Sequence, residues 1–345
     1  MTGKSLNIGI AGTGFMPGTG PATYFQAIQE CLAKDHNLCL FAGCGPVVPD
    51  LVHLVDAKRV PLQALHAMPV PVIADFHDHY WTSFQPFPAP DLLLRLVRQR
   101  SLLSHHLEVL KRSAAVIVHS RAVAGSIQET IQKNLKNGPP VHVVPYGIKA
   151  SNIGYENTAE ADPASPLILF AGRDMFRKGF PVAVKALRKV REKKPGARLR
   201  VIGEEYVHTR FAARLLSLGQ PVEFLPAQSP GELERHYSEA SVLVLPSRQE
   251  AFGIVLVEAM AAGLPVAAAR QGGIPEAVED GVSGLLHKPG DSADLADKIL
   301  ALLDDSGIRE RIVQGGHERA RSFSLSAMKK SLERAYFSVA EGAQS

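Results

Sequence analysis

The hydrophobic residues of this chain occur in short runs that alternate with segments of helical periodicity. Runs such as LNIGIAG at 6–12, VPVIADF at 70–76 and LILFAGR at 167–173 are mostly apolar, with a glycine or a polar residue at their end or directly after it. Short apolar runs separated by helical patterns are typical of βαβ units, in which the parallel strands are buried on both faces. The pattern therefore predicts an α/β fold with parallel sheets.

The predicted elements fall into two sets on either side of a polar segment. The predicted strands are 6–12, 38–43, 51–55, 70–76, 114–120 and 141–147, and then 167–173, 197–203, 222–226, 242–247, 265–269 and 284–289. The predicted helices are 22–33, 91–111 and 121–134, and then 179–192, 207–218, 230–240, 253–262, 274–279, 292–304 and 324–340. Gly263 stands where a helix ends and Pro265 follows it, so the helix at 253–262 should stop sharply.

The segment at 149–166 divides the chain, because it is polar and rich in Ala, Asn, Pro and Ser. A chain of 345 residues suits two domains of about 150–180 residues each. We expect an N-terminal domain at 1–150, a C-terminal domain at 151–322 and a terminal helix within 323–345. Two Rossmann-like, doubly wound domains would face each other across a cleft, with ligands bound at the carboxyl ends of the strands.

Composition and charge restrict the protein class only broadly. Hydrophobic residues make up 46% of the chain and the net charge is +4, which suits an anionic ligand without requiring one. The N-terminal apolar run is too short for a signal peptide, and no apolar run could span a membrane. Cys31, Cys39 and Cys44 form no zinc-ligand pattern, so we expect reduced, half-buried thiols. The expected location is the cytoplasm.

A cluster of cations follows the strand at 167–173. The sequence FAGRDMFRKGF carries Arg173, Arg177 and Lys178 in an expected exposed turn, between the end of a strand and the start of a helix. Cations beside a helix N-terminus form an anion site that favours phosphate. The alternative is an ordinary charged surface turn.

Two glutamates mark a second region of interest. Glu250 is expected in the loop after the strand at 242–247, and Glu258 in the apolar helix that begins near Gly253. A carboxylate in such a helix is costly unless it accepts hydrogen bonds, for example from a ribose diol. The backbone N–H groups of 251–254 would suit sugar oxygens or phosphate. The alternative is a solvated Glu258 at the open end of the helix.

These residues resemble a known family. EAFGIVLVE matches the E-x7-E signature of retaining glycosyltransferases, and GRDMFRKG and GGIPEAVEDGVSGLL are similar to glycosyltransferase family 4, which has the GT-B fold. The resemblance runs from about residue 165 to 322 and is highly specific. In the first half it is looser, and rests on PGTGPATYF, PDLVHLVD, PVIADFHD and VIVHSRAV.

The resemblance implies roles for individual residues. Arg173 and Lys178 should hold the diphosphate of a nucleotide sugar donor, and Glu258 the ribose hydroxyls. Glu250 and the amides after it should meet the transferred sugar, and His77 should lie beside the sugar and the acceptor. The donor-binding set implied in this way is Gly18, Gly20, Arg173, Lys178, Glu250, Ala251, Phe252, Gly253, Ile254 and Glu258. The N-terminal domain would serve the acceptor, the C-terminal domain the UDP- or GDP-sugar, and the terminal helix would cross back onto the first domain.

The chain departs from the family pattern at three places. Gly203-Glu204-Glu205 replaces the usual Gly-x-Gly, and Tyr146 stands where asparagine is usual. Little sequence lies between Val55 and Val70, a region that often shapes the acceptor pocket. The reaction class is unaffected, whereas the sequence does not specify whether the hydroxyl acceptor is a sugar, a lipid-linked molecule or another small molecule.

The expected mechanism needs neither a metal ion nor another cofactor. No D-x-D motif occurs, so Arg173 and Lys178 would supply the fixed positive charge where the departing diphosphate becomes more negative. The resemblance implies retention by front-face attack, with the leaving phosphate taking the acceptor proton. The residues expected to act in catalysis are Arg173, Lys178, Glu250 and His77.

Other patterns admit other hypotheses. GIAGTG at 9–14 is part of a dinucleotide fingerprint, but Pro17 occupies the third glycine position, so an NAD-dependent dehydrogenase is a distant alternative. A catalytically silent sugar-nucleotide-binding protein of the same fold is another. His77 and His79 are too few ligands for a metal site.

The helix at 91–111 carries Leu92, Leu96, Leu103, Leu107 and Leu110 on one stripe, which predicts a core-facing helix. Its basic residues allow a second hypothesis, contact with anionic lipid on the inner face of the cytoplasmic membrane. No interleaving of aromatic and basic residues indicates nucleic-acid binding.

Overall fold

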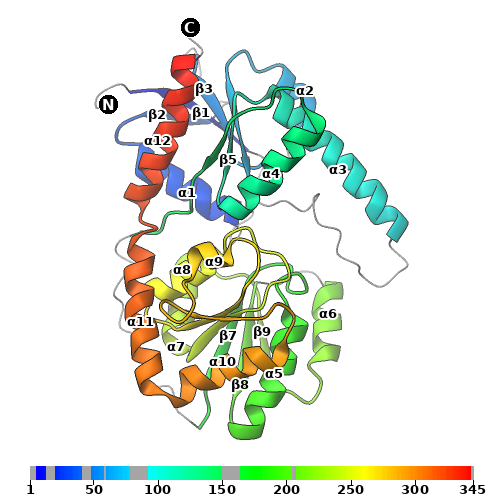
Figure 1. The fold of residues 1–345 in the computed structure, drawn as a ribbon, viewed down its shortest axis with the longest axis vertical. Coiled ribbons are helices and arrows are strands. Elements are labelled where there is room, and N and C mark those ends of the chain that lie inside the picture. The colour runs from blue at the N-terminus through cyan, green and yellow to red at the C-terminus, as the bar shows by residue number, and fades with distance from the viewer. Residues whose placement is uncertain are drawn as a thin grey trace. The chain divides into compact units, whose positions relative to one another are not determined.

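The chain forms two compact units, each built around a six-stranded parallel sheet (Figure 1). The computed structural model describes residues 5–12, 20–40, 48–57, 60–77, 92–149, 164–203 and 207–342, and of 20–21, 92–100, 207–211 and 230 the backbone only. The first unit includes 20–147 and the C-terminal segment from Leu325, and the second includes Ile148–Ser324. The expected α/β class with two Rossmann-like halves is confirmed.

The first unit has the strand order β2-β1-β3-β4-β5-β6, and neighbouring strands are parallel. Its strands are β1 (Asn7–Ala11), β2 (Asn37–Leu40), β3 (Leu51–Leu54), β4 (Val72–Phe76), β5 (Ala115–Val118) and β6 (Val141–Val143). Its helices are α1 (Gly20–Leu32), α2 (Leu62–His66), α3 (Leu92–Arg112), α4 (Arg121–Asn134) and α12 (Leu325–Gly342). Ser120 caps α4 through its side chain, which accepts a hydrogen bond from the Val123 amide.

Helix α12 packs against the first unit although it is last in the sequence (Figure 1). Tyr336 on α12 is fully buried, and Leu332 and Ala335 join it in the core. Lys329 pairs with Asp35, and the Glu333 carboxylate lies 3.3 Å from His36 Nε2. The C-terminal helix therefore crosses back to the N-terminal sheet, as the resemblance implies.

The second unit has the strand order β12-β11-β10-β7-β8-β9, again all parallel. Its strands are β7 (Leu167–Ala171), β8 (Arg198–Ile202), β9 (Val222–Leu225), β10 (Val242–Leu245), β11 (Val266–Ala269) and β12 (Leu285–His287). Its helices are α5 (Phe180–Lys193), α6 (Val207–Leu216), α7 (Pro230–Glu239), α8 (Ile254–Ala261), α9 (Ile274–Ala277), α10 (Ser292–Asp304) and α11 (Ser306–Arg321).

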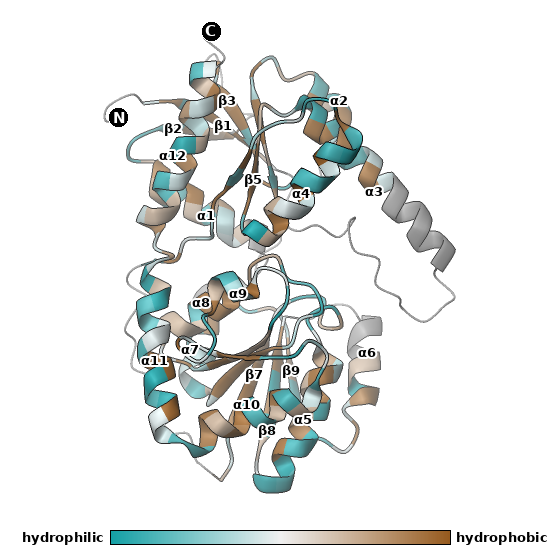
Figure 2. Cartoon of the chain, viewed as in Figure 1, coloured by the Kyte–Doolittle hydropathy of each residue, from teal (hydrophilic) through white to brown (hydrophobic). Residues whose placement is uncertain are grey.

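The hydrophobic runs become the centre of each sheet. Strands β7, β10 and β11 are buried along their whole length, as are β3, β4 and β5 of the first unit. Figure 2 shows the labelled strands β3, β5 and β7 largely in the colours of apolar residues, whereas α4 carries several polar residues. Burial of both sheet faces explains why the strands read as continuous apolar runs rather than as alternating ones.

Two helices were not predicted from the pattern. Helix α2 is only five residues long, and α11 is polar and contains Gly315-Gly316. Gly315 is needed for packing, because a Cβ at this position would lie 2.2 Å from the Val282 carbonyl oxygen. The sequence did not indicate α11 because its buried residues, Ile312, Gly316 and Ala320, include a single large apolar side chain.

The remaining expectations for the first unit have mixed outcomes. Leu110 of α3 is buried while Leu102 is 38% exposed, which fits a core-facing stripe in the described half of that helix. Leu92 and Leu96 lie where only the backbone is described.

Cys31 has a free thiol, but Cys39 is disulfide-bonded, so the expectation of reduced thiols is wrong for Cys39. None of the helices described is long and apolar enough to cross a membrane.

Candidate functional site

The cationic segment at 172–179 forms a tight loop between β7 and α5. Asp174 adopts a left-handed conformation (φ 55°), which is strained for a residue with a side chain. The Asp174 carboxylate accepts a hydrogen bond from Arg177 Nε at 3.0 Å. Arg173 is half-buried at the start of the loop, directly after the strand and Gly172. The loop therefore has a fixed shape at the carboxyl end of β7, where ligands bind in doubly wound folds.

Gly179 brings this loop against the neighbouring strand. Its φ is 86°, and a Cβ at this position would lie 1.8 Å from the Pro246 carbonyl oxygen. Only glycine permits both the conformation and the close approach. Pro246 directly follows β10, so the cations after β7 lie beside the residues that follow β10.

Lys178 forms an ion pair with Glu250 across these two loops. The side chains are only 14% and 7% exposed, so Lys178 is not in the exposed turn expected from the sequence. Ser247 donates a further hydrogen bond to Glu250 Oε2 at 3.2 Å. The sequence identified both charged residues but did not show that they contact each other.

The two charges hold each other in their ionised forms. Burial opposes ionisation of Glu250, but Lys178 and Arg177 and the hydrogen bonds from Lys178 and Ser247 outweigh it, so its pKa lies below the ordinary value. Burial also lowers the pKa of the Lys178 ammonium group, against the attraction of Glu250. The result is a desolvated pair at the sheet edge.

The backbone around Glu250 is held from two sides. Arg177 Nη1 donates to the Gln249 carbonyl oxygen at 3.1 Å, and the Gly273 amide donates to the Glu250 carbonyl oxygen at 3.0 Å. A Cβ at Gly272 would lie 2.1 Å from that same carbonyl oxygen. The Glu250 loop is thus clamped between the cationic loop and the segment before α9, which fixes the carboxylate in place.

Helix α8 begins directly after this loop, as predicted. Gly253 is the N-cap residue with φ 90° and offers no side-chain cap to the first turn, which starts at Ile254. The Ala251 and Phe252 side chains point into the core, and the Phe252 ring lies edge-on to Phe323 at 5.2 Å. Any contact of 251–253 with a ligand therefore falls to their backbone amides.

Glu258 lies on α8 and accepts a hydrogen bond from the Tyr237 hydroxyl of α7 at 2.9 Å. Burial raises the pKa of Glu258 to about 7, against the Tyr237 hydrogen bond, and Glu234 raises it further. Tyr237 itself is 2% exposed. Glu258 is therefore half-buried and tethered, unlike the solvated glutamate of the alternative reading.

His77 belongs to the first unit and follows β4. Its side chain is 6% exposed, with Nδ1 at 2.7 Å from the Tyr146 hydroxyl and Nε2 at 3.8 Å from Asp75 Oδ1. Tyr146, which replaces the usual asparagine, thus orients this histidine. Gly20 forms the first residue of α1, while Gly18 and His79 lie outside the described residues.

Asp75, His77 and His119 also place three potential metal-ligand atoms within 4.8 Å of one another. The sequence missed this cluster because Asp75 lies inside a buried strand and His119 follows the next strand. Residues at the carboxyl ends of adjacent parallel strands meet at one sheet edge, and that topology was the available signal. Tyr237 and Ser247 were missed as well, since neither belongs to a charged motif.

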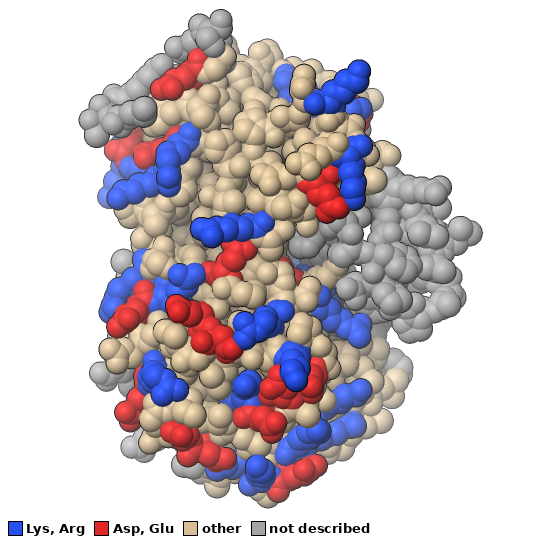
Figure 3. Space-filling view, viewed as in Figure 1, with Lys and Arg blue, Asp and Glu red and all other residues tan. Residues whose placement is uncertain are grey.

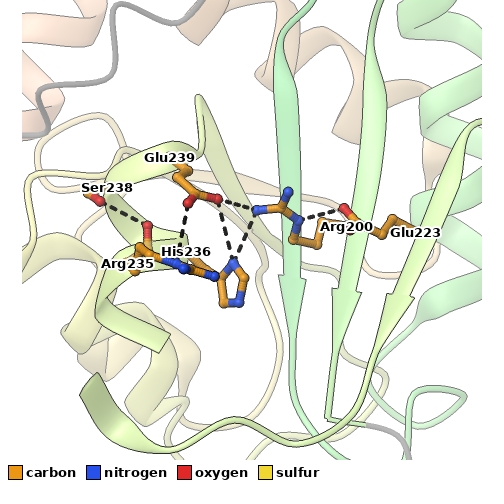
Figure 4. A network of polar contacts seen from close by, with 6 residues as sticks. All are labelled: Arg200, Glu223, Arg235, His236, Ser238 and Glu239. Carbon is orange, nitrogen blue, oxygen red and sulfur yellow. Dashed lines mark hydrogen bonds and ion pairs between the residues drawn. The ribbon is translucent and has the colours of Figure 1, made fainter. Parts of the chain in front are cut away.

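A second polar network lies across β8, β9 and α7 of the second unit (Figure 4). Arg200 Nε donates to Glu223 at 2.7 Å, and Arg200 Nη1 lies 2.5 Å from Glu239 and 3.1 Å from His236. The Arg200 side chain is 13% exposed, but both glutamates are at least 41% exposed. The anionic partners of this network are therefore solvated, whereas Arg200 and His236 are buried.

Comparison with known proteins decides the family. A family model described as "Glycosyl transferases group 1" matches residues 156–319. D-inositol 3-phosphate glycosyltransferase of Actinosynnema mirum is 31% identical over 296 residues, which cover 75% of this chain and 71% of that protein. The chain belongs to the glycosyl transferases group 1 family.

A longer relative and two solved structures extend the comparison. The sulfoquinovosyl transferase of Arabidopsis thaliana is 27% identical over 339 residues, 93% of this chain and 62% of that protein, so this chain spans less than two thirds of that relative. Sucrose-phosphate synthase of Thermosynechococcus elongatus superposes with a TM-score of 0.70 at 24% identity, covering 86% of this chain and 74% of that one. Anabaena HepE in complex with UDP and glucose superposes with a TM-score of 0.75 at 18% identity, covering 96% of this chain and 99% of that one. Both share the GT-B fold.

Proposed function

We propose that this group 1 family member is a retaining, metal-independent glycosyltransferase that moves a sugar from a UDP- or GDP-sugar to a hydroxyl acceptor. The observation that carries the proposal is the desolvated Lys178–Glu250 pair at the carboxyl ends of β7 and β10. Family membership supports the reaction class, and the UDP-glucose complex of Anabaena HepE supports the donor class by analogy. The name of the Actinosynnema mirum relative, D-inositol 3-phosphate glycosyltransferase, supports a hydroxyl-bearing acceptor by analogy.

In this proposal the second unit binds the donor. Arg173 and Lys178 meet the diphosphate, whose negative charge increases as the glycosidic bond breaks. The amides that start α8 bind oxygens of the sugar or the phosphate, and the Glu258 carboxylate accepts hydrogen bonds from the ribose diol. Tyr237 holds Glu258 in place for that task.

The Lys178–Glu250 pair supplies one positive and one negative charge for the transfer reaction. Glu250 holds Lys178 at the carboxyl end of β7 and lies where the transferred sugar gains positive character. The bond between the anomeric carbon and the phosphate oxygen breaks, and the acceptor oxygen bonds to the same face of that carbon. The leaving phosphate oxygen takes the acceptor proton. Fixed cations perform the task that a divalent ion performs in metal-dependent enzymes.

Transfer in the presence of a chelator tests the proposal. A panel of UDP- and GDP-sugars is first screened by thermal shift, since a bound ligand raises the melting temperature by mass action. The selected donor is then incubated with acceptors in EDTA, and the anomeric configuration of the product is read by proton NMR. We expect unchanged activity and retained configuration.

Two outcomes would overturn parts of this proposal. Loss of activity in EDTA that is restored by magnesium or manganese would contradict the metal-independent mechanism, and an inverted product would contradict retention. Nucleotide binding without donor hydrolysis or transfer to any acceptor would favour the catalytically silent alternative.

A further inference from the structure

Three metal-ligand atoms converge at the carboxyl edge of the first sheet. Asp75 lies in β4, His77 directly follows β4, and His119 directly follows β5. His119 Nε2 lies 2.9 Å from Asp75 Oδ1, and His77 Nε2 lies 3.8 Å from the same oxygen. Asp75 and His119 are fully buried, so these atoms face one another and not solvent.

Two of these atoms lack the hydrogen bonds that buried polar atoms normally make. Among the residues that the structure describes, neither Asp75 Oδ1 nor His119 Nε2 has a hydrogen-bond partner, and their 2.9 Å contact does not have the geometry of a hydrogen bond. Buried polar atoms in folded proteins are nearly always paired with protein, with water or with an ion. The orphaned pair therefore indicates a ligand between the two side chains.

The outer contacts of the two histidines turn their Nε2 lone pairs toward Asp75. His119 Nδ1 lies 2.8 Å from the Val144 carbonyl oxygen, which can only accept, so the ring hydrogen is on Nδ1. The Tyr146 hydroxyl lies 2.7 Å from His77 Nδ1 and can accept in the same way. Histidines that bind metal ions typically donate their other ring N–H to a partner of this kind, which fixes the ring and its tautomer.

The second carboxylate oxygen of Asp75 is already held. His53 Nε2 lies 3.3 Å from Asp75 Oδ2, and the Tyr336 hydroxyl of α12 lies 2.7 Å from His53 Nδ1. In the described part of the chain, Asp75 makes its ion-pair contacts with histidines and not with lysine or arginine. Because a buried carboxylate needs a positive partner or a metal ion, Oδ1 is available for a cation.

A cation satisfies this arrangement better than a water molecule. Asp75 Oδ1 and the two Nε2 lone pairs are three acceptors, whereas a water molecule has only two hydrogens to donate. Zinc lies about 2.0–2.2 Å from nitrogen and oxygen ligands, so two ligand atoms of a tetrahedral site are about 3.3 Å apart. The observed separations from Oδ1, 2.9 and 3.8 Å, lie on either side of this value.

We propose that Asp75, His77 and His119 bind a divalent transition-metal ion such as zinc. Two imidazoles and one carboxylate are a donor set that suits zinc and its neighbours in the first row, whereas magnesium and calcium prefer oxygen ligands. The three described ligand atoms leave a coordination position for water. The site is built from the first unit alone, so its ion does not replace Arg173 and Lys178 in the proposed mechanism.

The bound ion connects separate parts of the first unit. Its ligands come from the end of β4 and from the segment after β5, and Tyr336 of α12 supports them through His53. An ion that binds the folded state raises its stability by mass action. The sequence considered His77 without Asp75 and His119, which only the parallel topology brings to it.

Zinc titration of the full chain tests the site without reference to activity. The protein, freed of any affinity tag, is stripped with EDTA, exchanged into metal-free buffer and titrated with zinc in competition with a chromophoric chelator. We expect one zinc ion per chain, bound with micromolar affinity or tighter, and a higher melting temperature with zinc. X-ray absorption of the loaded protein should show imidazole ligands at about 2.0–2.1 Å.

Substitutions in the site give a graded response. Asp75→Asn and His119→Gln each remove a ligand and should raise the Kd for zinc by about 100-fold or more, while Tyr146→Phe removes only the support of His77 and should raise it about 10–100-fold. The matched control His66→Gln removes an exposed histidine of α2 in the same unit and should leave the Kd unchanged.

Two results would overturn the proposal. One is a wild-type protein that binds no stoichiometric zinc, and the other is equal binding by the wild type and the ligand variants, which would show an adventitious ion only. If melts show that Asp75→Asn or His119→Gln does not fold, His77→Gln decides in the same way, because the His77 side chain reaches the surface. Binding is measured without donor or acceptor, and the transfer assay in EDTA uses the metal-free form, so the site and the proposed function can each fail alone.

Discussion

Two ion-pair networks in the second unit use similar residues in different surroundings. Lys178 and Glu250 are both nearly buried, at 14% and 7% exposed. Arg200 is buried to a similar degree, but its partners Glu223 and Glu239 are 50% and 41% exposed (Figure 4). One pair is desolvated on both sides, and the other has solvent on its anionic side.

The difference indicates which network serves function. Ion pairs with solvated partners contribute little to stability, and their presence needs no functional explanation. A pair that is desolvated on both sides costs more to form, and a packed apolar pair would often serve folding better. The Lys178 loop also contains the strained Asp174, and strained residues cluster at functional sites. On the face of the molecule shown in Figure 3, by contrast, cations and anions of the second unit intermingle as solvated charges do.

The largest expected effect separates the two networks by activity. Lys178→Met should lower kcat by about 10²–10³, as loss of one preorganised charge does elsewhere. Arg200→Met, the matched control, should leave kcat within about twofold. Because Lys178→Met leaves Glu250 buried without its cation, the variant Lys178→Met/Glu250→Gln should recover stability but not activity. Steady-state kinetics and thermal melts measure both, and wild-type kcat in Lys178→Met would show that the pair is structural.

A smaller effect concerns Glu258 and pH. Its pKa of about 7, against an ordinary 4.5, reflects a site that favours the neutral form until a ribose donates hydrogen bonds to it. Binding of UDP should therefore lower this pKa, release protons near pH 7 and tighten as pH rises from about 6 to 8. Calorimetry in two buffers of different ionisation enthalpy measures the release. The control Glu258→Gln removes the titration of residue 258 and keeps that of the nucleotide itself. An equal proton release from the wild type and this variant would refute the proposed role of Glu258 in binding the ribose.

The same shift predicts how stability changes with pH in the unliganded protein. A raised folded-state pKa means that the folded state binds more protons than the unfolded state between pH 4.5 and about 7. The contribution of Glu258 is therefore most favourable below pH 4.5 and is lost as pH rises to 7, by about 1–3 kcal/mol. Urea unfolding of wild type and Glu258→Gln at pH 5 and pH 7.5 measures this contribution. The free energy of unfolding should fall less between these two pH values in the variant than in the wild type.

The smallest effect concerns the solvated network. Arg200→Met should lower the free energy of unfolding by about 1 kcal/mol, because most of its partners are exposed. The difference should shrink in 1 M salt, where the Debye length is about 3 Å. Urea unfolding at low and high salt measures it. A loss of several kcal/mol that salt does not change would show that this network is as desolvated as the Lys178 pair.

The sequence predicted the sheets well because strands buried on both faces leave an unmistakable apolar pattern. Every strand of both sheets was expected, while α11 was not, since Gly315 packs against backbone and the helix buries few large apolar side chains. The charged residues of the candidate site were found as motifs. The pairing of Lys178 with Glu250 could not be predicted, because it depends on Gly179 and on the contact between the loops that follow two different strands.

The buried polar cluster around Asp75 in the first unit was the least predictable part of the structure. Asp75 lies inside an apolar run, where a single acidic residue carries no periodic signal. His53, His119 and Tyr336 are separated from it by tens to hundreds of residues, and only the parallel topology and the return of α12 bring them together. Tyr146 was noted as a departure from the family pattern, but its contact with His77 could not be read from the sequence.

The most direct test of the account is calorimetry of UDP, or of GDP where the donor screen selects it, with Glu250→Gln and Glu258→Gln. Glu258 is proposed to bind ribose, which the product nucleotide retains, so Glu258→Gln should raise the Kd about tenfold. Glu250 is proposed to face the sugar and to hold Lys178, so Glu250→Gln should leave the Kd unchanged or lower it, because Lys178 becomes free for the diphosphate. Thermal melts confirm that both variants are folded. Equal weakening of the bare nucleotide by the two substitutions would contradict the account.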